Sequence, residues 1–226
     1  MKHLKILHLN NSDITQSSIN FLNVEELSIR HNPLVTDISH MSNLKILDIS
    51  GNNKLAIKNL DLIELYVSYN SFYNSWTINI GHMTNLKVLD IRFSTIGQQD
   101  IDTLDLVELR ITGNQGIYKV SHMKNLKILY AGAPCIIGQN EINQLDLIEL
   151  YIHNNTMINN VNHMKNLKTL YIGFKCSVHQ NGISQLRLIE TLSIVFNKNI
   201  HDVTHLPLLK NLIHDEKRLV FNNLSK

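Results

Sequence analysis

The chain repeats one spacing, apolar-x-x-apolar, at eleven places, and an apolar residue usually follows two positions later. The repeats begin at Leu4, Val24, Leu44, Leu62, Leu86, Leu106, Leu126, Leu147, Leu167, Ile189 and Leu209, at intervals of 18 to 24 residues. Counting from that first residue, Leu47 and Ile49 stand at positions 4 and 6. Apolar residues at alternate positions are typical of one face of a short strand. A single repeat is too short to bury that face, so we predict that neighbouring repeats stack into a parallel sheet over a continuous core.

Asparagine recurs at position 9, directly after each predicted strand. Its amide can hydrogen-bond backbone groups in the turn that ends a strand. The residues are Asn32, Asn52, Asn70, Asn114, Asn155 and Asn197. Most odd-numbered repeats carry another residue there, so we predict an asparagine ladder that is complete only on alternate repeats.

Odd-numbered and even-numbered repeats differ, so the underlying period is a doublet of about 41 residues. Odd-numbered repeats open with a motif such as HMKNLK at 122–127 and have a long return segment, for instance 96–104. The apolar spacing of that segment suits one or two helical turns opposite the sheet. Even-numbered repeats return through shorter segments such as 117–120, which we expect to be extended or 3₁₀.

The segment 44–55, Leu-x-x-Leu-x-Ile-x-x-Asn-x-x-Leu, resembles the leucine-rich-repeat consensus, and similar blocks cover residues 4 to about 214. The repeats are most similar to the short bacterial type of about 20 residues, which includes the internalins. The resemblance implies an α/β leucine-rich-repeat solenoid, a curved right-handed coil with a parallel sheet on the concave face and short helical or 3₁₀ turns on the convex face. It also implies that the protein binds other proteins.

The two ends of the chain differ in kind. We expect the solenoid to span 1–213 and a short amphipathic cap to span 214–226. Residues 1–7 match 123–129 at all but one position, so the chain begins inside a repeat. An uncapped first repeat exposes apolar residues and a free strand edge. We therefore expect this edge to be covered by an upstream segment or by a second copy of the protein in a homodimer.

Composition narrows the function classes. A formal net charge of +2 gives no attraction toward nucleic acid or an anionic membrane surface. No apolar run approaches the roughly 20 residues of a membrane helix, and the N-terminus does not resemble a signal peptide. Cys135 and Cys176 lie two repeats apart, about 10 Å, which exceeds the span of a disulfide. We predict that both are reduced and that the protein is cytoplasmic or otherwise intracellular, with a secreted effector as the alternative.

The sequence offers no catalytic or metal-binding motif. One repeat position carries His40, His82, His122, His163 and His205. These histidines are about 10 Å apart, too far to share a zinc ion, so we expect each to hold its own turn by hydrogen bonds. The chain contains no glycine-rich phosphate loop, nucleophile elbow, Cys-x-x-Cys pair or His-Glu-x-x-His run. We predict no enzyme activity, no cofactor and no metal.

Lysine and glutamate alternate along the predicted sheet. Odd-numbered repeats carry lysine at position 2, and even-numbered repeats carry glutamate at position 3: Lys5, Lys45, Lys87, Lys127, Lys168 and Lys210 against Glu26, Glu64, Glu108 and Glu149. We expect these side chains to pair across neighbouring strands, and we prefer this interpretation to a phosphate or nucleic-acid site.

Aromatic residues and arginines occupy the positions that point away from the core. The candidate partner-binding residues are Tyr66, Tyr69, Asp90, Arg92, Phe93, Arg110, Tyr130, Tyr151, His153, Tyr171 and Phe174. Tyrosine and arginine are enriched in interface hot spots. The three tyrosines of successive repeats, 130, 151 and 171, should form a stacked row beside Phe174, with a shallow pocket left by Gly132, Ala133 and Gly173. The alternative is that these aromatic residues only stabilise the sheet.

These patterns predict a non-enzymatic recognition module that binds a protein partner, and neither nucleic acid nor membrane, on the concave sheet face. Two alternatives stay open: a substrate-targeting or regulatory fragment of a larger enzyme, and a small-ligand or carbohydrate site on the tyrosine row. The repeat that begins at Leu62 is the longest, at 24 residues, and contains Trp76. We expect Trp76 either to pack over the core or to contact a partner.

Overall fold

The computed structural model describes residues 3–52, 54–70, 78–214 and 217–220. Trp76 lies outside the described residues, as does 221–226 of the expected cap. The chain divides into two compact units, Met1–Arg110 and Ile111–Lys226, here called unit 1 and unit 2. Each unit is a leucine-rich-repeat solenoid, which confirms the predicted fold class.

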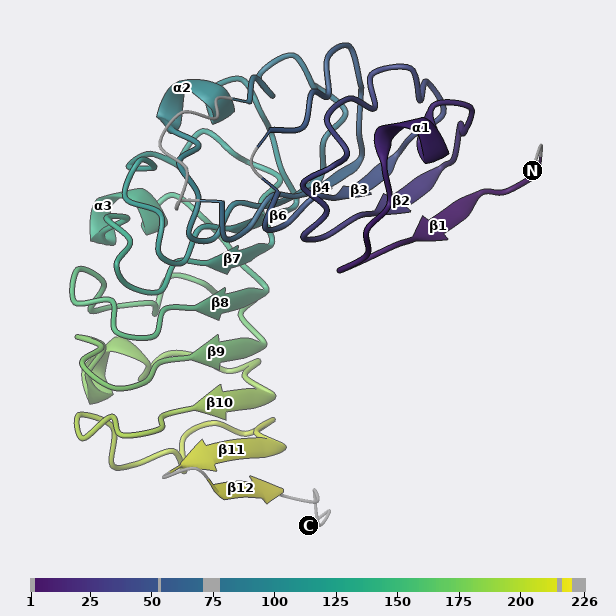
Figure 1. Ribbon diagram of the computed structural model, residues 1–226. Coiled ribbons are helices and arrows are strands. Elements are labelled where there is room, and N and C mark those ends of the chain that lie inside the picture. The colour runs from purple at the N-terminus through teal and green to yellow at the C-terminus, as the bar shows by residue number, and fades with distance from the viewer. Residues whose placement is uncertain (1–2, 53, 71–77, 215–216, 221–226) are drawn as a thin grey trace. The chain divides into compact units, whose positions relative to one another are not determined.

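The strands of unit 1 lie side by side in chain order (Figure 1). They are β1 (Ile6–His8), β2 (Glu26–Ser28), β3 (Ile46–Asp48), β4 (Glu64–Tyr66), β5 (Val88–Asp90) and β6 (Glu108–Arg110). All are parallel, and like positions pair with like, as Leu27 does with Leu47 and Leu47 with Leu65. Each strand therefore covers positions 3 to 5 of its repeat.

Within unit 2 like positions also pair with like, but its last strand differs in direction. Its strands are β7 (Ile128–Tyr130), β8 (Glu149–Tyr151), β9 (Thr169–Tyr171), β10 (Thr191–Ser193), β11 (Asn211–His214) and β12 (Lys217–Val220). The pairs from β7 to β11 are parallel, whereas β12 runs antiparallel to β11. β12 is therefore the edge strand of the sheet next to β11.

Burial follows the repeat positions. The leucine at position 4 is fully buried from Leu27 through Leu192, and position 6 forms a second buried row beside it. Positions 3 and 5 lie on the opposite face of each sheet, which we call the open face. Leu7, in the first repeat, is only half-buried because a repeat packs on one side of it alone. The core is thus made by stacking, as the pattern predicts.

The return segments carry short helices in odd-numbered repeats. These are α1 (Gln16–Ile19), α2 (Gln98–Ile101), α3 (Gln139–Ile142) and the 3₁₀ turn η1 (Gln180–Gly182). They lie across the coil from the strands (Figure 1). The segment 117–120 of an even-numbered repeat has no helix, as expected. The third repeat departs from the doublet because its shorter return segment forms a bridge, Asp37 with Ala56, instead of a helix.

A glutamine at the start of three of these turns ties neighbouring return segments together. The Oε1 atom of Gln139 accepts hydrogen bonds from the backbone N–H groups of Asn159 and Asn160 at 2.9 and 3.0 Å, and its Nε2 donates to the Asn160 carbonyl at 2.8 Å. Gln16 and Gln180 make the same three bonds to their own neighbours. This tie was not predicted from the sequence, although glutamine recurs at 139 and 180, one doublet apart.

The asparagines at position 9 are buried, and Asn32, Asn52 and Asn155 donate hydrogen bonds to backbone carbonyls. Asn52 donates to the Ile29 carbonyl at 2.7 Å, and its Oδ1 accepts from the backbone N–H of Asn32 at 2.6 Å. Asn155 donates to the Ala131 and Ile137 carbonyls at 3.0 and 3.1 Å. The predicted role is therefore confirmed for Asn32, Asn52 and Asn155, whereas the buried amide of Asn70 has no hydrogen-bond partner among the described residues. In the first repeat Ser12 stands at this position and bonds to Asn32 instead.

Candidate functional site

The repeated histidines are structural. The Nε2 atoms of His40, His82, His163 and His205 each lie within 2.8–3.3 Å of a backbone carbonyl oxygen in the preceding repeat. This confirms that they hold their turns. Within the described part of the chain, no three His, Cys, Asp or Glu side chains are grouped so that they could hold a metal ion.

The lysine–glutamate ladder was predicted with the wrong partners. Lys5 pairs with Glu25 at 2.7 Å, and Lys210 with Glu190 at 2.5 Å, both at position 2 of an even-numbered repeat. The position-3 glutamates bond mainly along their own strands. Glu64 accepts from the Tyr66 hydroxyl at 2.8 Å, and Glu149 from the Tyr151 hydroxyl at 2.7 Å. Positions 3 and 5 of one strand share a face, so that partner is as near as the next strand's lysine.

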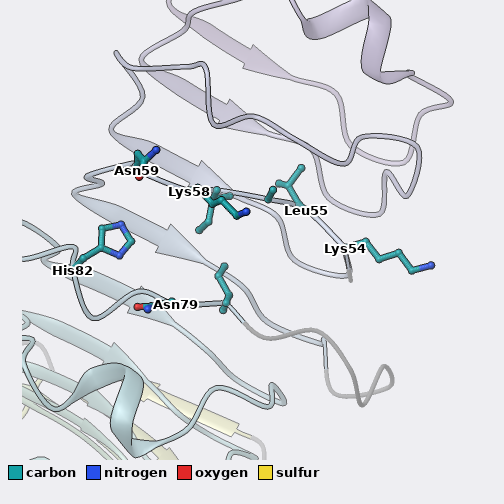
Figure 2. Close-up of a pocket in the computed structure, with 9 residues that line it drawn as sticks. Lys54, Leu55, Lys58, Asn59, Asn79 and His82 are labelled. Carbon is teal, nitrogen blue, oxygen red and sulfur yellow. The ribbon is translucent and has the colours of Figure 1, made fainter.

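A hollow between the return segments of the third and fourth repeats is a poor candidate for chemistry. It measures about 500 Å³ and is lined by two return segments, 54–59 and 78–82. Figure 2 shows Lys54 directed away from the other labelled side chains. The imidazole of His82 is already hydrogen-bonded to the Leu60 carbonyl. The lining thus offers no group of side chains that converge on a ligand.

The candidate residues fall into two groups, one on each unit. Tyr66, Tyr69, Asp90, Arg92, Phe93 and Arg110 lie together on unit 1, and Tyr130, Tyr151, His153, Tyr171 and Phe174 lie together on unit 2. The two groups differ in chemistry, because the first is charged and the second is aromatic.

The open face of unit 1 is organised around a buried carboxylate. Asp90 is only 2% exposed, and it accepts three hydrogen bonds from the Arg92 guanidinium at 2.6–3.1 Å. Arg110 lies 3.9 Å from the same carboxylate and also bonds to Glu108. Asp90 is therefore placed to orient the arginines rather than to touch a partner. The paired guanidiniums carry little free positive charge, which makes this face a weak anion site.

Two aromatic rings stand at the end of the unit 1 strands. Tyr69 and Phe93 occupy position 8 of neighbouring repeats and stack with ring centroids 5.2 Å apart. Both have positive φ angles, 62° and 51°, a backbone conformation that is uncommon for bulky residues. Tyr69 is about half exposed. Burial, and then the bond to Glu64, raise the pKa of nearby Tyr66 above its usual value, so its hydroxyl stays protonated as a donor.

The open face of unit 2 carries the predicted stack of tyrosines. The ring centroids of Tyr130 and Tyr151 are 3.9 Å apart with nearly parallel planes, and those of Tyr151 and Tyr171 are 4.8 Å apart. All three rings are half-buried. Burial and the bond to Glu149 raise the pKa of Tyr151, which keeps that hydroxyl protonated. The result is a rigid aromatic surface, here called the tyrosine row, with an edge open to solvent.

The pocket expected beside this row does not form where the glycines were thought to leave it. Gly132 and Gly173 are buried under His153: an added Cβ would lie 3.1 Å from the His153 carbonyl at Gly132 and 2.8 Å from its Nδ1 at Gly173. His153 also meets Tyr171 edge to face at 5.8 Å. The glycines therefore make room for His153, and burial lowers the pKa of its imidazole.

A cavity does exist further along the strand ends of unit 2. It is lined by Phe174, Phe196, Asn197, Lys198, Ile200 and His214. Phe174 is 54% exposed and Phe196 is 52% exposed. Only Phe174 was among the candidates. The signal for Phe196 was its position 8, shared with Tyr69, Phe93 and Phe174.

Comparison with known proteins identifies the fold. Neither protein-family models nor curated protein sequences give a match. Among solved structures, the internalin inlF of Listeria monocytogenes aligns over 94% of this chain and 74% of its own, with 21% identity and a TM-score of 0.65. The functional domain of InlJ from the same organism aligns over 94% and 53%, with 20% identity and a TM-score of 0.55. The protein is thus a leucine-rich-repeat protein by fold, similar in architecture to internalins.

The structure also bears on membrane insertion through helices. The described helices are single turns, and none of them is long and apolar enough to cross a bilayer.

Proposed function

We propose that the protein is a non-enzymatic recognition module that binds another protein on the open face of its sheet, with the tyrosine row of unit 2 as the main contact. The observation that carries this proposal is the stack of Tyr130, Tyr151 and Tyr171. These rings point away from the core, which is filled by position 4 and position 6 without them. The fold shared with internalins is compatible with such a role.

The geometry supports high affinity for a small contact area. The stacked rings are held in place before binding, so they lose little side-chain entropy when a partner packs against them. Tyr151 is fixed further by its bond to Glu149 at 2.7 Å. On unit 1, Arg92 and Arg110 are oriented by Asp90 and offer hydrogen-bond donors of their own.

The double substitution Tyr151→Ala plus Tyr171→Ala tests the proposal. We expect it to abolish capture of the specific partner from an extract of the host, because it removes the centre of the contact. It should lower the free energy of unfolding by about 1–3 kcal/mol through lost stacking, leaving the fold intact. Pull-down with mass spectrometry and thermal denaturation measure the two effects.

Tyr118→Ala is the matched control, because Tyr118 is 59% exposed on a return segment of the same unit. It should leave capture unchanged. If the double variant captures as much partner as the control does, the tyrosine row is not the contact. If the unmodified chain captures a glycan and enriches no protein, a carbohydrate site would be favoured instead.

A further inference from the structure

The cavity at the strand ends of unit 2 is apolar inside and basic at its rim. It has a volume of about 630 Å³. Phe174 and Phe196 form its walls, and Ile200 beneath them is 4% exposed. Lys198 is an exposed part of the lining, and Lys175 places its Nζ 5.2 Å from the centre of the Phe174 ring. An apolar group that enters this cavity would therefore contact a lining that includes Lys198 and the Phe174 ring on which Lys175 lies.

The two phenylalanines are not explained by folding. Both are more than half exposed, so they contribute little to the core. Phe196 has a φ angle of 56°, where a bulky side chain costs roughly 1–3 kcal/mol relative to glycine. Position 6 of the last repeat is also unusual. His214 stands there, whereas Ile194 and Ile172 fill the core at position 6 of the two preceding repeats. His214 and the two outward phenylalanine rings line the cavity.

Charge is distributed unevenly between the units. Unit 2 contains twelve Lys and Arg residues against seven Asp and Glu, whereas unit 1 contains nine against twelve. The net charge of +2 is therefore the sum of +5 and −3. No Asp or Glu occurs between Glu149 and Glu190, the stretch that includes Tyr151, Tyr171, Phe174 and Lys175. Asp215 and Glu216, which follow His214, lie outside the described residues.

We infer that this cavity receives an aromatic or branched aliphatic side chain from an acidic segment of a partner protein, whose carboxylates pair with Lys175 and Lys198. The inference rests on the proposed function and names the partner's chemistry. The cavity and the proposed contact share a repeat, because Tyr171 ends the tyrosine row and Phe174, which lines the cavity, follows three residues later. An apolar anchor with flanking charges is how many peptide segments bind grooves.

A peptide selection tests the inference with a defined probe. A random peptide library is displayed on phage and panned on the immobilised full chain. We expect the enriched peptides to carry a net negative charge next to an aromatic or branched aliphatic residue. The best peptide, labelled with a fluorophore, should bind more weakly by about tenfold or more when salt is raised from about 50 to about 500 mM.

Three double variants separate the causes. Phe174→Ala plus Phe196→Ala removes the walls, and Lys175→Glu plus Lys198→Glu reverses the rim charge; each should weaken the peptide by about tenfold or more. The control, Lys54→Glu plus Lys58→Glu, makes the same change of charge on exposed lysines of unit 1 and should stay within about twofold. Circular dichroism verifies that each variant is folded.

The outcomes distinguish this inference from the proposed function. Suppose that the peptides no longer bind the Tyr151→Ala plus Tyr171→Ala variant but bind the Phe and Lys variants normally. That result would overturn the inference about the cavity and would leave the tyrosine row as the contact. Enrichment of neutral or basic peptides, or equal weakening by the unit 1 control, would overturn the acidic partner. Binding of phosphatidylserine vesicles or single-stranded DNA with no peptide enriched would overturn both.

Discussion

At the residue scale, an asparagine at position 9 such as Asn155 stabilises the corner of its repeat, where neither strand nor helix satisfies the backbone. Asn155 is buried, donates to the Ala131 and Ile137 carbonyls, and accepts from the Met157 N–H at 2.8 Å. Each of these backbone groups would otherwise be buried or half-buried without a partner. A buried polar group that loses its only partner costs about 1–3 kcal/mol.

Asn155→Ala is therefore expected to lower the free energy of unfolding by about 2–4 kcal/mol, since more than one bond is lost. Urea denaturation measures the change. Asn159→Ala, at an exposed asparagine of the same repeat, should alter stability by less than about 0.5 kcal/mol. Equal effects of the two substitutions would contradict the structural role of position 9.

The two thiols are also a residue-scale matter. Burial raises the pKa of Cys135 to about 11 and raises the pKa of Cys176 as well. Because the thiolate is the reactive form, Cys135 should react with a disulfide reagent at pH 8 about 100-fold more slowly in the native protein than in guanidinium chloride, and Cys176 should also react more slowly. Folding that disfavours the thiolate also means that stability falls as pH rises from about 8.5 toward 11. Fast labelling of the native protein would argue against the buried position of these side chains.

At the scale of elements, the glutamine tie decides how the return segments stay in register. Gln139 begins α3 and reaches the next repeat, where two N–H groups and one carbonyl bond to its single amide. The turns themselves are too short to be stable alone. Their order therefore depends on such ties and on the isoleucine that each α-helix buries, for instance Ile142.

We expect Gln139→Ala to accelerate amide hydrogen exchange at Asn159 and Asn160 and to cost about 0.5–1.5 kcal/mol. Gln139→Glu keeps both acceptor bonds and loses the donor to the Asn160 carbonyl, so it should restore part of the protection. Exchange measured by NMR distinguishes the variants. Unchanged protection at both amides in Gln139→Ala would show that the tie is dispensable.

At the scale of the whole molecule, stability comes from contacts between neighbouring repeats. Leu150 of β8 is fully buried and pairs with Leu129 on one side and Leu170 on the other. Repeat arrays behave as chains of such nearest-neighbour terms. A defect in one repeat should therefore be felt first by the repeats on either side.

Leu150→Ala should lower the free energy of unfolding by about 2–5 kcal/mol through the cavity it leaves. Hydrogen exchange should show the loss of protection concentrated in β7, β8 and β9, with β2 to β4 much less affected. Tyr151→Ala, on the open face of the same strand, provides the comparison because it removes a large side chain without opening the core. Uniform loss of protection across both units would contradict a nearest-neighbour array.

The sequence alone determined the fold, the strand positions, the buried rows, the role of the repeated histidines and asparagines, and the stacking of Tyr130, Tyr151 and Tyr171. These features depend only on period, because every repeat places a given position in the same surroundings. Only the tertiary structure decided which of several neighbouring side chains pair with one another. It paired Glu64 with Tyr66 instead of a lysine, buried Asp90 between arginines, filled the space beside Gly173 with His153, and opened a cavity between Phe174 and Phe196. Such outcomes depend on side-chain length and direction at differences of a few ångströms, which a repeat pattern does not specify.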